Sequence, residues 1–149
     1  MIPHKWIIAA VRSKVQAEVT LVTDIEYPGM RIDKRDLAKW LEVDVLTSTP
    51  KKRTRGDKDR KVVQIAFKVW VKSTSNIYEH QKIAAQIAEA FDNGKCWDIL
   101  DRGAPLMPKI GTLVFLEPTS SNRTPDLESR LRTVTRCHVI TLSALAQES

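Results

Sequence analysis

Two carboxylates, Glu42 and Asp44, come nearest in this sequence to the residues of a hydrolytic site. Together with Gln64 and Lys68 they supply the residue types of a nuclease, in which acidic side chains hold a metal ion and a lysine stabilises charge. Their spacing is too general to predict that chemistry. We therefore interpret them as outward-facing polar positions.

The remaining residues that could do chemistry also lack a supporting pattern. The histidines at 4, 80 and 138 show no metal-ligand spacing, and Cys137 and His138, adjacent on a predicted strand, would face opposite sides. The sequence has no Gly-x-Ser-x-Gly, and none of its five glycines forms a phosphate-binding loop. We expect no catalytic residue, no metal and no cofactor, and hence a protein that attaches to partners and is not an enzyme.

A basic segment between two predicted strands is the most distinctive feature of the chain. Residues 51–61 contain seven Lys or Arg and two Asp, a local charge of +5 against +6 for the whole chain. Charge confined to one loop of an otherwise nearly neutral protein indicates a projecting contact element. The candidate partner-binding residues are Lys51, Lys52, Arg53, Arg55, Lys58, Arg60 and Lys61.

This basic segment has three interpretations. It can be a solvated loop without a partner, as many charge runs are. It can neutralise nucleic-acid phosphates, although no aromatic side chain is interleaved to stack on bases. It can dock on an acidic protein surface or become ordered on assembly, which we favour because Gly56 and two aspartates make it less polycationic than a DNA-binding arm.

Length and composition predict one ordinary globular domain. The 149 residues are 42% hydrophobic and 28% charged, and no apolar run is long enough to cross a membrane. The apolar N-terminal patch is interrupted by Arg12 and Lys14, so we predict no signal peptide and synthesis in the cytosol. Cys96 and Cys137 are expected to be buried, reduced thiols.

Strict alternation predicts two strands, Trp40–Leu46 and Val62–Lys72, paired antiparallel. Their apolar positions would face the core, while the second face would carry Glu42, Asp44, Gln64, Lys68 and Lys72. Trp70 falls among these polar residues. It would be either an interface anchor or a side chain covered by a loop of its own chain.

Helical periodicity and turn residues define the other predicted elements. We expect helices at His4–Leu21, with Lys14 on its polar face, and at Ile77–Asp92, which a capping box of Asn76 and Glu79 would open. Further strands are expected at Thr112–Glu117 and Val134–Leu142, with a polar loop at Thr119–Arg132 and a frayed tail at Ser143–Ser149. The order αββαββ predicts an α+β, two-layer fold with an antiparallel or mixed four-stranded sheet packed against two helices.

This succession resembles the tail terminator, or tail completion, proteins of tailed bacteriophages. The resemblance covers about His4 to Leu145 and includes the run Val69-Trp70-Val71-Lys72-Ser73-Thr74-Ser75-Asn76 into the second helix and the run Leu113-Val114-Phe115-Leu116-Glu117-Pro118. It implies a single terminator-like domain over residues 1–149, with long loops at 47–61 and 119–132.

The resemblance also implies a structural, non-enzymatic role in the virion, at the neck of the tail. Such a protein forms a hexameric ring on the last ring of the tail tube, ends tail polymerisation and joins the head-side connector. The implied partners are other copies of the chain, the tail tube protein and the connector or stopper protein, with a sheath as a further candidate; assembly would take place in the host cytoplasm, without a membrane. DNA would pass through the ring without sequence-specific binding. Possible interface residues are Trp70, Glu42, Asp44, Lys68 and Arg123.

Two rival functions stay open from the sequence. A head–tail connector or other neck protein of the same virion would share the small α+β plan and differ in its position in the particle. A nucleic-acid-binding α+β module that uses the basic segment would be distinguished by binding to DNA that weakens steeply as salt rises.

Overall fold

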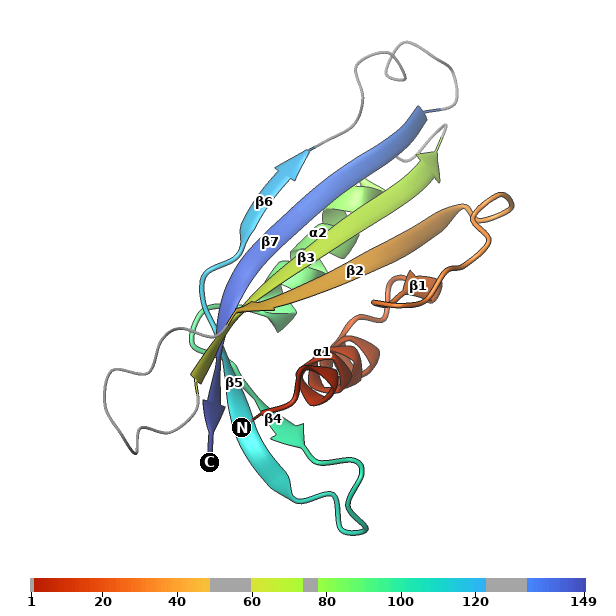
Figure 1. Cartoon of the computed structure of the whole chain (residues 1–149). Coiled ribbons are helices and arrows are strands. Elements are labelled where there is room, and N and C mark those ends of the chain that lie inside the picture. Colours follow the sequence, from red (N-terminus) through yellow and green to blue (C-terminus); the bar gives the residue numbers. More distant parts are fainter. Residues whose placement is uncertain (1, 49–59, 74–77, 123–133) are drawn as a thin grey trace.

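The structure, a computed structural model, describes residues 2–48, 60–73, 78–122 and 134–149 (Figure 1). Within them the fold is mostly β: seven strands form one curled, mixed sheet, a half-barrel, with two helices. The predicted four-stranded, two-layer fold with order αββαββ was therefore wrong. Among the described residues, no helix combines the length and apolar content that crossing a membrane requires.

The helices and strands follow each other along the chain in the order α1, β1, β2, β3, α2, β4, β5, β6, β7. Their bounds are α1 His4–Glu18, β1 Ile25–Glu26, β2 Lys39–Ser48, β3 Arg60–Ser73, α2 Glu79–Ala90, β4 Cys96–Leu100, β5 Lys109–Phe115, β6 Thr119–Asn122 and β7 Val134–Glu148. Asn76, the predicted cap, lies outside the described residues, and no side-chain hydrogen bond caps α2 at Tyr78.

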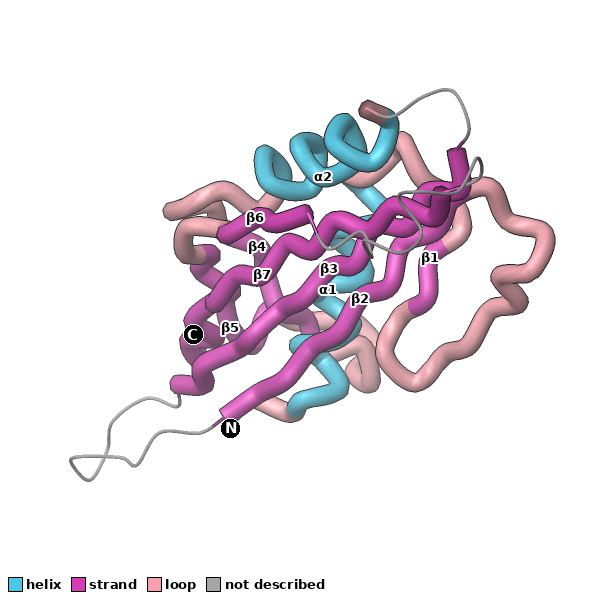
Figure 2. The backbone as a smooth tube through the Cα atoms, turned by 90° about the horizontal axis from the view of Figure 1, so that it is seen from above, coloured by secondary structure: helices cyan, strands magenta, loops and turns pink. Residues whose placement is uncertain are grey.

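The centre of the sheet is formed by β2, β3 and β7, which pair antiparallel as predicted for β2 and β3. Figure 2 shows β6, β7, β3, β2 and β1 side by side, with α2 next to β6 and β7. β7 pairs with β3 from Val134 to Gln147, and on its other side first with β6 and then with β5. β1 adds a parallel pairing at the far edge, and this makes the sheet mixed.

The errors in the predicted sheet have two physical causes, the shortness of some strands and the weak apolar signal of alanine. β1 has two residues and β6 has four, too few for alternation to be recognised, and β6 occupies the start of the predicted polar loop. β7 continues to Glu148, so the predicted frayed tail is a paired strand. There, Ala144 and Ala146 are buried although their small side chains give a weak apolar signal.

Both helices pack on the inner face of the curled sheet and share one buried cluster with it. The predicted apolar positions of β2 and β3 belong to this cluster, as do Ile83, Ile87 and Phe91 on the predicted stripe of α2. In α1, Ile7, Val11 and Val15 are buried as expected, and the helix ends at Glu18, earlier than predicted. The chain then turns so that the Thr20 and Leu21 N–H groups donate to the Gln86 side chain of α2.

Lys14 is buried, contrary to its predicted place on the polar face of α1. Only 2% of it is exposed, and its Nζ donates to Glu18 at 2.7 Å. The same ammonium lies 4.8 Å from the ring centroid of Trp97 and 5.4 Å from those of Phe91 and Phe115. The lysine stem thus fills core space, while three aromatic rings and one carboxylate compensate its charge.

We expect Lys14→Met to leave the free energy of unfolding within about 1 kcal/mol of the unchanged chain, because an apolar side chain of similar volume replaces a buried ion pair at little net cost. Lys14→Ala should lower it by about 2–5 kcal/mol through the cavity that it leaves. Urea unfolding of both variants checks this. Equal losses in the two variants would show that the charge, and not the volume, is what the core requires.

Candidate interaction surface

The outer face of the sheet, opposite the helices, carries the polar residues that the sequence placed there. Glu42 stands opposite Lys68 in the pairing of β2 with β3, and Asp44 stands opposite Ala66. Asp44 and Lys68 are exposed, while Glu42 is half-buried. The predicted separation into a buried and an exposed face is confirmed for these two strands, and the outer face divides into two parts that differ in how they are covered.

One part is a tryptophan cluster, formed by Trp40 and Trp70, beside the connection from β1 to β2. Trp70 stacks on Trp40, with ring centroids 5.9 Å apart and planes 14° from parallel. Lys72 donates to the carbonyls of Lys34 and Arg35 and so holds that loop beside the rings. Trp70 itself is half-buried, and its role as an interface anchor stays a prediction.

Lys34 completes this cluster by bridging two carboxylates. Its Nζ lies 2.8 Å from Glu42 and 3.1 Å from Glu26. Burial raises the pKa of the Glu42 carboxyl, but the hydrogen bonds from Lys34 and from the Trp40 indole outweigh it, so this pKa is lowered overall. Glu42 is consequently a charged structural residue here, already occupied by partners within the chain.

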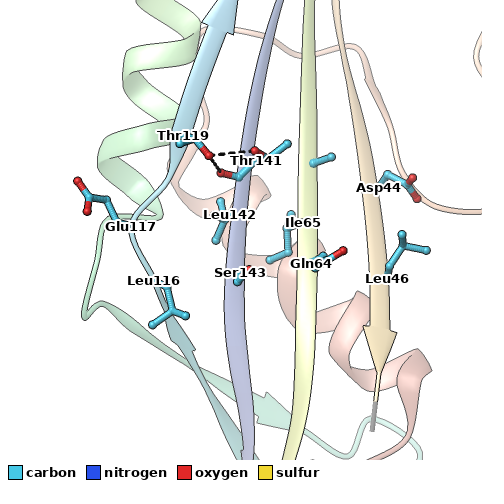
Figure 3. Close-up of a pocket in the computed structure, with 11 residues that line it drawn as sticks. Asp44, Leu46, Gln64, Ile65, Leu116, Glu117, Thr119, Thr141, Leu142 and Ser143 are labelled. Atoms are coloured by element: carbon cyan, nitrogen blue, oxygen red, sulfur yellow. Dashed lines mark hydrogen bonds between the residues drawn. The ribbon is translucent and has the colours of Figure 1, made fainter. Parts of the chain in front are cut away.

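The second part of the outer face is a groove of about 420 Å³, which we call the acidic groove (Figure 3). Strands β2, β3 and β7 form its floor, and the connection from β5 to β6 forms one wall. Its lining residues are Asp44, Leu46, Gln64, Ile65, Ala66, Leu116, Glu117, Thr119, Thr141, Leu142 and Ser143. Thr119 is fixed by its hydroxyl, which donates to the Thr141 carbonyl at 3.1 Å.

Charge and apolar surface coincide in the acidic groove. Asp44 and Glu117 stand on opposite sides of it, as Figure 3 shows, and neither forms a salt bridge within the described residues. Leu46 is 62% exposed and Leu116 is 40% exposed, which is high for such side chains. The residues that line the groove include no Lys or Arg. Lys68 lines a neighbouring hollow of the same face, which also contains Asp44. The groove thus offers two anions around exposed apolar groups.

The structure places only the end of the basic segment. Arg60 and Lys61 belong to β3, where they pair with Gln147 and Ala146, and Arg60 is exposed. The other predicted partner-binding residues of the segment lie outside the described residues; they are Lys51, Lys52, Arg53, Arg55 and Lys58. Arg123, in the second predicted loop, also lies outside them. β2 extends to Ser48, so the segment joins the ends of two paired strands.

The cysteines and histidines, together with the acidic residues, are the side chains that could bind a metal ion. No group of three His, Cys, Asp or Glu that could hold a metal ion occurs among the described residues. Cys137 is buried as expected, and burial raises the pKa of its thiol, whereas Cys96 is exposed, contrary to prediction. His138 of β7 lies with its ring centroid 5.7 Å from that of the buried His80 of α2, and its Nε2 is hydrogen-bonded to Ser120.

His138 predicts a loss of stability in mild acid. Burial lowers the pKa of its imidazole, so between the lowered and the ordinary pKa the unfolded chain binds more protons. The stability that the neutral His138 imidazole contributes is fully present above about pH 6.5, the ordinary histidine pKa. It is lost as the pH falls through the lowered pKa of the folded chain. We expect His138→Gln to reduce the drop in melting temperature between about pH 7.5 and 5.5.

The matched control for this pH experiment is His4→Gln, at an exposed histidine of α1. Thermal unfolding followed by circular dichroism at both pH values checks the prediction. An unchanged drop in the His138 variant, or an equally reduced drop in the His4 variant, would contradict it.

Half of the acidic groove was missed by sequence reasoning. Asp44 was recognised, but Leu116, Glu117, Thr141 and Ser143 were assigned to separate strands and a tail with no indication that they meet. The run Thr112–Glu117 gave no such indication, because Leu113, Val114, Phe115 and Leu116 are all apolar and show no alternation from which an outward position could be read.

Comparison with known proteins shows the fold. No protein-family model and no curated protein matches this sequence. A solved chain that bears no functional name superposes with a TM-score of 0.67 at 14% identity, over 99% of this chain and 97% of that chain. A chain from the virion of a native gene transfer agent (GTA) particle superposes with a TM-score of 0.59 at 14% identity, over 96% of this chain and 95% of that chain. This fold is thus one that a virion protein also has.

Proposed function

We propose that this chain is a structural protein of a virion and that it acts as a tail terminator, a ring that caps the tail tube and joins it to the head-side connector. The observation that carries the proposal is the superposition with a chain of a virion over nearly the whole length of both chains. The resemblance in element order to tail terminator proteins of tailed bacteriophages supports the narrower role.

The surfaces of the molecule support an assembling subunit over an enzyme. Within the described residues no metal-binding group of side chains occurs, and the groove on the outer face joins exposed leucines to two carboxylates that form no ion pair with any other described residue. Exposed apolar surface with a polar rim is typical of protein contacts. β1 pairs only with Leu41 and Glu42 of β2, so the rest of that strand edge has no strand partner among the described residues, and unpaired edges are templates for pairing with another subunit.

Light scattering of the purified chain over a range of concentrations, at low and physiological salt, tests the proposal. A closed ring of six chains, seen also by negative-stain electron microscopy, is the expected result. Purified tail tubes added in a second run should be capped at one end. A chain that stays monomeric, does not bind the tubes and binds duplex DNA in a salt-dependent way would overturn the proposal in favour of a nucleic-acid-binding module.

A further inference from the structure

We propose that the acidic groove of one chain binds the basic segment of a neighbouring copy, through residues 51–59, the part that precedes β3. The inference rests on the proposed ring and names the contact that would hold its subunits together. It starts from the two carboxylates of the groove, Asp44 and Glu117, which have no ion-pair partner in the described chain.

Charge complementarity identifies the occupant. Residues 51–59 carry five cations and two anions, a local charge of +3, and two further cations, Arg60 and Lys61, follow at the start of β3. The groove lining carries two anions and no cation. Opposite potentials on two surfaces steer association and disfavour wrong partners. Nucleic acid does not fit the groove, because phosphates would face the two carboxylates.

The shape of the groove suits an extended segment with long side chains. Asp44 and Glu117 stand on opposite sides of the floor (Figure 3), so a chain lying across it meets an anion on each side. Leu46 and Leu116 offer apolar surface on which the methylene stems of Lys and Arg can pack while their charged ends reach the carboxylates. A volume of about 420 Å³ holds several side chains of a peptide but not a folded domain.

A contact between two different surfaces of the same chain is the type that closes a ring. In such a head-to-tail contact each copy donates one surface and receives the other, and a suitable rotation between copies gives a cyclic assembly. The segment joins Ser48 and Arg60 at the ends of two paired strands, whereas the groove opens on the face of the sheet. The two surfaces are therefore distinct parts of the molecule.

Charge reversal tests the proposal. The groove variant carries Asp44→Lys and Glu117→Lys, both at exposed positions; the segment variant carries Lys51→Glu, Lys52→Glu, Arg53→Glu and Arg55→Glu. We expect each variant alone to lose the ring, because like charges then meet at every contact. Equal amounts of the two variants should restore it, since each groove then finds a segment of opposite charge.

A control with Glu89→Lys and Asp92→Lys, exposed near the end of α2, should form rings like the unchanged chain.

The other outcomes overturn the proposal in distinguishable ways. Rings formed by both variants separately would refute the groove contact while leaving the ring intact. A third result is that the mixture of the two variants forms no rings, whereas one chain carrying both sets of reversals does. This result would show that the segment binds the groove of its own chain and not that of a neighbour.

A peptide of residues 49–61 tests the contact without the ring. It should bind the unchanged chain and bind the groove variant about tenfold more weakly or worse, the effect of losing two surface ion pairs. Equal binding to both chains would refute the contact. An unchanged chain that stays monomeric but binds the peptide through the groove would refute the ring alone.

Discussion

Phe91→Ala is expected to lower the free energy of unfolding by about 3–5 kcal/mol, the range for truncating a fully buried phenylalanine. No part of Phe91 is exposed, and its ring centroid lies 4.9 Å from that of Phe67 and 5.0 Å from that of Phe115. The ring follows α2 directly and contacts β3 and β5, so it connects the helix to two strands that are not adjacent in the sheet. A loss of this size is a large fraction of the stability of a typical domain, about 5–15 kcal/mol.

Phe91→Leu is the matched control, because it keeps most of the apolar volume and removes the aromatic contacts. We expect it to lose less than half as much stability as the alanine variant. Urea unfolding of both variants, with the slope compared as well as the midpoint, measures the two losses. A loss below about 1.5 kcal/mol for Phe91→Ala would show that the core closes around the missing ring.

Gly111→Ala is expected to disrupt the pairing of β5 with β7. A Cβ at this position would lie 2.6 Å from the Gln147 backbone oxygen and 2.9 Å from Ile2 Cδ1. A side-chain end can move aside, but the carbonyl belongs to a strand held on its other side by β3. Overpacking of this kind costs about 1–3 kcal/mol, and a backbone contact places the variant at the upper end of that range or beyond.

The control for this substitution is Gly29→Ala. Gly29 has φ +80° and no atom within 4 Å of its added Cβ, so alanine there meets backbone strain but no clash, at a cost of about 1 kcal/mol. Chemical unfolding compares the two losses, and amide hydrogen exchange of residues 144–148 shows whether the end of β7 opens. Equal losses in the two variants would mean that β7 shifts freely away from β5.

The two parts of the outer face explain why one surface is occupied and the other is open. In the tryptophan cluster Trp40 is buried, and Lys72 and Lys34 bind the connection from β1 to β2 to this part of the sheet. The acidic groove has no such cover among the described residues, and its leucines stay exposed. In a ring-forming subunit, the open part is where a neighbouring copy would bind, and charge reversal tests this directly.

The sequence by itself determined the elements whose residues follow a strong period. In β2 and β3, apolar and polar side chains alternate over long stretches, so the strands, their antiparallel pairing and their buried faces were predicted correctly. The apolar stripes of α1 and α2 were recognised for the same reason. The basic segment was recognised because charge is a property of the residues themselves, although the partner that it meets stays a prediction.

Only the tertiary structure decided the features that depend on which strands lie side by side. The curled seven-stranded sheet exists because β7 pairs with β3 on one side and with β6 and β5 on the other. Lys14 is buried because aromatic rings from two strands and the end of α2 meet above α1. The acidic groove brings Asp44 and Glu117 together across two intervening strands. The local period of the sequence predicts which face of the sheet a side chain lies on. Its neighbours depend on the order of the strands, and that order follows from the packing of the whole chain.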